Sequence, residues 1–355
     1  MGKERLCCDI NPSSLLLTGG ERVARAEKRH LGSVDYIKAI AIVAVVLTHA
    51  GLHVGNPALT AFEKIIRQSW VDFQVPSFFL VAGFLYHRAS AISWGEVGRR
   101  LQRILVPYLV ASGLVIALGY SGSREIQDIL FDLATGDALG IYYFVFALCS
   151  CIPFIWLFSR LPTAALWAVL VALLAYSWLM SFGYWPRPTT TWFWTVRDLF
   201  FTFFLGYFLT GWLMARHLDS FRSLFVSIEN WIWPPILAGA SVYVTFKVQA
   251  MWADSSAGRA FSFYRIGYTL GVAGLIVIFT HRLRVPRVVR FLSEASLTLY
   301  LYHRLFQFEF LPFTFDWSPL ARIVAMLVVG LLGASLIAVL GRKLLGRHSR
   351  LLLGY

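Results

Sequence analysis

The sequence predicts an all-α fold, a polytopic bundle of about ten transmembrane helices with both termini in the cytoplasm. Of its 355 residues, 58% are hydrophobic and only 14% are charged, whereas an average soluble domain has roughly 45–50% apolar and about 25% charged residues. Apolar segments of about 20 residues, the length that crosses a bilayer, recur along the chain. Lys and Arg gather in every second connection. This composition excludes a disordered chain, a coiled coil and an ordinary soluble enzyme.

Ten segments have the length and apolarity of a membrane span. The fourth and fifth are separated only by residues 159–162, so we expect them to form an antiparallel hairpin. Residues 1–33 lack the apolar core of a signal peptide, and we expect them to be a cytoplasmic tail. A single membrane domain then covers 34–341, and 342–355 form a second cytoplasmic tail. The expected spans are residues 34–54, 71–89, 104–121, 139–158, 163–181, 192–214, 231–250, 264–281, 288–311 and 319–341.

The distribution of basic residues sets the predicted orientation. With the N-terminus inside, 21 of the 32 Lys and Arg residues fall on the cytoplasmic side and six on the external side. Cytoplasmic loops carry such an excess, and the anionic cytoplasmic leaflet attracts it. The net charge of +13 therefore indicates membrane lipids as partners and not nucleic acid. The four cysteines have no spacing typical of a metal site, so we expect no bound metal.

Two histidines are expected well inside the membrane. His49 lies 11 residues beyond Lys38 in the first span, roughly 16 Å farther out, and His303 lies 13 residues beyond Arg290 in the ninth, roughly 20 Å farther out. Both spans run outward, so the two imidazoles should lie at similar depth in the outer half. Histidine is well suited to remove a proton from a hydroxyl near neutral pH. A purely structural role for both remains the alternative.

A basic element begins the third span. Arg100 and Arg103 are three residues apart and share a helix face, and two guanidiniums on one face suit a polyphosphate or pyrophosphate. The alternative is that both only anchor the helix at the cytoplasmic surface.

Four elements, taken in order, resemble membrane acyltransferase family 3, the integral-membrane O-acyltransferases that decorate bacterial glycans. Two features depart from the family pattern: Lys38 stands where the family usually has Arg, and Glu294 where it more often has a basic residue. Lysine keeps the charge but not the planar fork of arginine. The four elements are residues 34–49 with Asp35, Lys38 and His49; the aromatic and glycine-containing 76–85; Arg100-x-x-Arg103 followed by Pro107; and 291–303, which ends in Leu-Tyr-His303.

The resemblance implies an acyl-CoA-dependent O-acyltransferase of the bacterial inner membrane. The donor would be acetyl-CoA or another acyl-CoA, and the acceptor a sugar hydroxyl of an exopolysaccharide, O-antigen or lipid-linked glycan. Arg100, Arg103 and Lys38 would bind the donor, with Asp35 supporting Lys38. His49 would deprotonate the hydroxyl or carry the acyl group transiently. His303 would orient the acceptor or carry a second proton.

Two other functions are weighed against this one. A glycan-precursor transporter or flippase would show repeated halves and carboxylates near the membrane midplane, and neither is visible in the sequence. A non-catalytic subunit of a polysaccharide assembly complex would need the aromatic and basic residues but not His49. Substitution of His49 therefore separates the enzyme from both alternatives.

Overall fold

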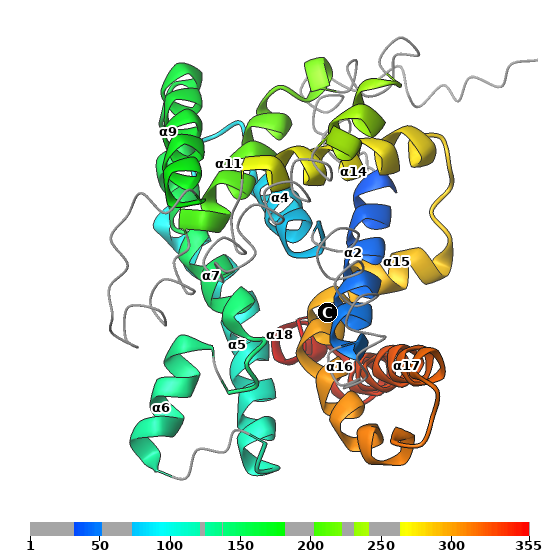
Figure 1. Ribbon diagram of the computed structural model, residues 1–355. Helices are drawn as coiled ribbons and strands as arrows, with labels where there is room; N and C mark the ends of the chain where they lie inside the picture. Colours follow the sequence, from blue (N-terminus) through cyan, green and yellow to red (C-terminus); the bar gives the residue numbers. More distant parts are fainter. Residues whose placement is uncertain are drawn as a thin grey trace, which may run out of the picture.

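The prediction of an all-α protein is confirmed for the part of the chain that the structure describes. A computed structural model places helices, and no strand, within these ranges (Figure 1). Residues 1–31, most of the tail predicted at the N-terminus, lie outside them, as do parts of the sixth and seventh predicted spans. The structure describes residues 32–51, 73–120, 125–136, 138–181, 202–221, 231–240 and 263–354.

Three of the described helices are long and apolar enough to cross a bilayer. They are α2 (Gly32–Gly51), α5 (Trp94–Ala117) and the helical stretch that starts with α17 (Pro319–Leu345). The other predicted spans correspond to shorter helices, so the number ten stays a prediction. The helices that correspond to them are α4 (Gln74–Tyr86), α7 (Tyr143–Cys151), α8 (Phe154–Phe158), α9 (Thr163–Ser181), α11 (Thr202–Arg216), α14 (Phe263–Thr280), α15 (Arg287–Glu294) and α16 (Ser296–Phe310). Two further helices, α6 (Ile126–Thr135) and α18 (Ser349–Leu352), lie outside the predicted spans.

Several helix boundaries differ from the predicted spans. Helix α5 begins ten residues before the predicted start at 104, because Ser93 caps it by accepting a hydrogen bond from the Glu96 N–H at 3.3 Å. The fourth span is two helices, α7 and α8, since Pro153 has no N–H to continue α7. The ninth span is bent at Ala295 between α15 and α16. Hydrophobicity defines an apolar segment but not these local interruptions.

The segment from residue 342 packs against the bundle, and its predicted cytoplasmic location stays a prediction. Helix α17 continues to Leu345, and Gly346 then adopts a φ of +51°, a conformation that glycine takes at little cost. The chain folds back as α18, which lies between α5 and α16 (Figure 1). Leu353 is buried, and its carbonyl accepts a 2.6 Å hydrogen bond from the Thr298 hydroxyl.

Helices α4 and α11 lie in backbone contact through two glycines. A Cβ at Gly83 would overlap the backbone of Phe208, and one at Gly211 would overlap the backbone of Leu80. Small residues allow such close approach in membrane helix pairs. On the other side of α4 lies α2, which also packs against α14, α15, α16 and α17. Helix α2 therefore contacts five other helices within the described part of the chain.

We predict that Gly211→Ala lowers the free energy of unfolding by about 1–3 kcal/mol, because the new methyl group would force α4 and α11 apart. The measurement is the thermal midpoint of the detergent-solubilised protein, followed by size-exclusion chromatography. Gly113→Ala is the matched control, since a Cβ at this helical position meets nothing within 4 Å. An unchanged midpoint for Gly211→Ala would contradict the close packing.

Candidate active site

The structure brings the two predicted membrane histidines into direct contact. Nε2 of His303 on α16 lies 3.1 Å from Nδ1 of His49 on α2, and the ring centroids are 5.1 Å apart with the planes tilted by 43°. The residues are 254 positions apart in the sequence. Because the rings touch, they lie at the same depth in the bundle.

Neighbouring carbonyl groups determine which nitrogen of His303 carries the proton. Nδ1 of His303 lies 2.9 Å from the carbonyl oxygens of Leu299 and Tyr300. A carbonyl oxygen only accepts hydrogen bonds, so in the neutral ring the proton is on Nδ1 and the lone pair on Nε2. This assignment rests on the hydrogen-bond network. His303 therefore presents an acceptor to His49.

The acceptor on His303 in turn fixes the tautomer of His49. Two lone pairs cannot form a hydrogen bond, so Nδ1 of His49 must be the donor to His303. The same N–H also lies 2.9 Å from the carbonyl oxygen of Val45. The lone pair of neutral His49 is therefore on Nε2. This nitrogen can accept a proton, while Nδ1–H keeps its bond to His303.

The two imidazoles differ in exposure, and this difference separates their roles. His303 is 0% exposed, whereas His49 is half-buried. A substrate can therefore reach His49 but not His303 in this arrangement. His303 is placed to orient the ring of His49 and to support its tautomer, and the predicted catalytic role of both residues stays a prediction.

Gln307 links its own helix, α16, to α2 and α17 next to the histidine pair. It lies one turn beyond His303, is completely buried, and donates from Nε2 to the carbonyl oxygens of Val46 (3.0 Å) and Met326 (3.4 Å). These two acceptors belong to α2 and α17 and define the orientation of the amide. Gly330 permits the approach, because a Cβ there would lie 3.1 Å from Nε2. Gln307 thus limits sliding of α16 along α2 beside the histidines.

The N-terminal part of α2 carries the two other predicted site residues of this helix. Ser293 donates a 2.7 Å hydrogen bond to Oδ1 of Asp35, and both side chains are buried. Lys38 is half-buried, and Asp35 and Glu294 both attract its ammonium electrostatically. Lys38 precedes His49 by 11 residues, three helical turns, so the two lie on one face of α2.

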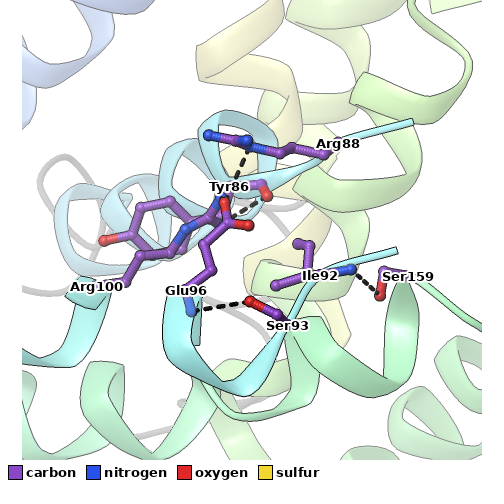
Figure 2. A network of polar contacts seen from close by, with 7 residues as sticks. All are labelled: Tyr86, Arg88, Ile92, Ser93, Glu96, Arg100 and Ser159. Carbon is purple, nitrogen blue, oxygen red and sulfur yellow. Dashed lines mark hydrogen bonds and ion pairs between the residues drawn. The ribbon is translucent and has the colours of Figure 1, made fainter. Parts of the chain in front are cut away.

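Arg100 and Arg103 lie on α5 but have different surroundings. Nη1 of Arg100 donates to the Tyr86 carbonyl at 2.8 Å and Nη2 to Oε1 of Glu96 at 2.7 Å, while the guanidinium lies 4.7 Å from the Tyr86 ring centroid. Figure 2 shows Arg100 beside Tyr86 and Glu96. Arg103 is exposed. The structure thus ties Arg100 to the end of α4 and leaves Arg103 at the surface.

Sequence reasoning missed two residues that hold these groups in place. Gln307 lies four residues after His303, a spacing that puts both side chains on one helix face. A buried amide in an apolar span was therefore a usable signal. Glu96 follows Ser93 by three residues, the spacing of a helix capping box, but its pairing with Arg100 depends on the fold.

The comparisons with known proteins agree with the helical membrane architecture. A family profile described as an acyltransferase domain matches residues 31–339, which include every helix named above except α18 and the last residues of α17. No curated protein and no solved structure matches the chain.

We predict that His49 is the Nδ1–H tautomer and that His303→Leu weakens this preference without abolishing it, because the Val45 carbonyl oxygen still accepts from Nδ1–H. The two-bond couplings between ring protons and nitrogens in ¹⁵N-histidine-labelled protein distinguish the tautomers of neutral imidazole. His303→Gln is the matched control, since its Oε1 can accept the same proton. A His49 in the Nε2–H form in the unmodified protein would contradict the assignment.

Proposed function

We propose that this chain, which belongs to the acyltransferase 3 family, is an O-acyltransferase that moves an acyl group, most simply acetyl, from cytoplasmic acyl-CoA to a sugar hydroxyl. The acceptor would be an exopolysaccharide, an O-antigen or a lipid-linked glycan. Family membership by itself supports the more general statement that the chain is a membrane acyltransferase acting on glycans. The observation that carries the proposed chemistry is the 3.1 Å contact between His49 and His303.

In the proposed reaction His49 is the general base. Its Nε2 takes the proton of the acceptor hydroxyl as the oxygen attacks the thioester carbonyl. The carbon–sulfur bond then breaks, and the coenzyme A thiolate leaves and recovers the proton from His49. General-base assistance of this kind contributes about 10²–10⁴-fold to a rate.

His303 assists without touching the substrate. When His49 is protonated, its Nδ1–H still donates to the neutral His303, which disperses the positive charge. The same hydrogen bond keeps Nε2 as the basic nitrogen between turnovers, as the aspartate does for the histidine of a Ser-His-Asp triad. A neutral imidazole stabilises the charge less than a carboxylate does, so loss of His303 should cost less than loss of His49.

The donor is expected to bind from the cytoplasmic side through Arg103, Arg100 and Lys38. Arg103 is exposed and can meet a phosphate directly, whereas Arg100 must share its donors with Glu96. Lys38 lies on the face of α2 that leads to His49. Its ammonium, attracted by Asp35 and Glu294, would interact with the donor between its phosphates and its thioester.

The proposed topology has ten spans, a domain over residues 34–341 and both termini in the cytoplasm of a bacterium, with the protein in the inner membrane. The direction of two helices supports it. Asp35 contacts Ser293, and farther along both helical segments His49 contacts His303. Helix α2 therefore runs in the same direction as α15–α16, as the first and ninth spans do in this topology.

We predict from this topology that reporter fusions after residue 350 read cytoplasmic, whereas insertions near Arg124 or Arg187 read external. The enrichment of Lys and Arg in the proposed cytoplasmic connections is the physical reason. The measurement pairs alkaline phosphatase with green fluorescent protein at each site. A periplasmic C-terminus would require an odd number of spans and overturn the proposed topology.

We predict that His49→Ala lowers acyl transfer by about 10²–10⁴-fold while coenzyme A binding persists. His49→Gln should be nearly as inactive, because an amide of similar size cannot accept the proton, and His303→Ala should be milder. The assay measures labelled acetyl transfer in membranes and the acyl mass on the host's surface glycan. His348→Gln, at an exposed histidine, is the control.

Two outcomes would count against the proposal. Transfer retained in a well-folded His49→Ala protein would exclude His49 as the base. A glycan mass that is the same with and without the chain would exclude the acceptor class, and a transporter or non-catalytic subunit would then account for the fold.

A further inference from the structure

Glu96 lies between two arginines at the start of α5. Its Oε1 is 2.7 Å from Nη2 of Arg100 and 3.0 Å from Nε of Arg88, which precedes α5. Figure 2 shows both arginine side chains converging on this carboxylate. One oxygen thus bonds two guanidiniums, which is also an arrangement in which arginines bind a phosphate oxygen.

The two arginines are held to different degrees. The side chain of Arg100 is 11% exposed and is fixed by the Tyr86 carbonyl and ring, whereas the side chain of Arg88 is 60% exposed. Glu96 is 16% exposed. An incoming anion can therefore displace Glu96 from a pair in which one member is fixed and the other is accessible.

The Glu96 carboxylate has an alternative hydrogen-bond donor within reach of a capping box, the backbone N–H of Ser93. Ser93 and Glu96 have the capping-box spacing, and the Ser93 hydroxyl already accepts from the Glu96 N–H. In a complete capping box the glutamate side chain also accepts from the backbone N–H of the serine. Here the carboxylate bonds the arginines instead. A change of side-chain rotamer would complete the box without moving the backbone of α5.

We infer that Arg88 and Arg100 form a phosphate-binding pair for the acyl donor. In the absence of the donor, the Glu96 carboxylate occupies the position that this phosphate takes. Donor binding then moves Glu96 onto the Ser93 N–H. This inference rests on the proposed function, since it concerns the donor of that reaction. It adds Arg88 to the donor site and makes Glu96 an internal competitor of the donor.

The test is the affinity of the full-length protein for coenzyme A, measured by calorimetry in a non-ionic detergent free of phospholipid. Glu96→Gln keeps the size and capping ability of the side chain but removes the competing charge. It should bind coenzyme A about fivefold more tightly, the equivalent of ~1 kcal/mol for a partly exposed ion pair. Asp219→Asn, which neutralises an exposed carboxylate outside this network, should leave the affinity unchanged.

The sign of the change decides the inference. A Glu96 that only positions Arg100 would make Glu96→Gln bind more weakly, and either this result or an unchanged affinity would overturn the inference. A gain seen with anionic lipid but not with coenzyme A would also overturn it, because the phosphate would then belong to the bilayer. Wild-type protein that binds no coenzyme A would instead refute the donor in the proposed function.

A second variant tests the other half of the pair. Arg88→Gln, at a side chain too exposed to support the fold, should weaken coenzyme A binding several-fold. In the Glu96→Gln background the loss should be at least as large, because Arg88 is then available to the phosphate alone. Normal coenzyme A affinity in both Arg88→Gln proteins would remove Arg88 from the site.

Discussion

An imidazole placed among apolar helices must obtain its hydrogen bonds from the protein, because lipid supplies none. At His303 the carbonyl groups of the preceding turn satisfy Nδ1, and only Nε2 remains for another helix. His49 supplies the partner, which requires α2 to lie directly against α16. The contacts of Gln307 with α2 and α17 hold this arrangement. The packing of α2 against both α16 and α17 satisfies the same requirement.

The unequal burial of the two histidines determines which of their nitrogens can act as a base. Two exposed histidines would exchange tautomers with water and present either nitrogen to a substrate. His303 is fully buried, and its Nδ1–H donates to carbonyl groups. His49 therefore keeps its own proton on Nδ1 and has one basic nitrogen, Nε2. A neutral partner also avoids placing a carboxylate at membrane depth, where an ionised side chain is costly. The arrangement thus gives up part of the charge stabilisation of an acid–histidine pair in return for a smaller desolvation cost.

The sequence was sufficient to predict the helical class and to select the two histidines, since both depend on local composition. Apolar length identified the three candidate membrane-spanning helices, and the scarcity of titratable groups within the predicted spans made His49 and His303 stand out. It was not sufficient for the bend at Ala295 or the return of Leu353 to the bundle, which depend on contacts between distant segments. The different surroundings of Arg100 and Arg103 could not be predicted for the same reason. Their spacing makes them equivalent on a helix, and only the position of Tyr86 distinguishes them.

The separation of charged and neutral groups also limits what the donor can be. Arg88 and Arg100 both contact Glu96 at the start of α5. The basic nitrogen that we propose, Nε2 of His49, lies near the C-terminal end of α2. On α2 alone, Lys38 and His49 are roughly 16 Å apart along the axis. A donor recognised by its phosphates at the arginines can present an acyl carbon to His49 only if a long, uncharged arm joins the two. An acyl phosphate, which carries its charge beside the reacting carbon, would have to bring that charge to the depth of the histidines. Under the proposed function, this layout fits a donor of the acyl-CoA type better than an acyl phosphate.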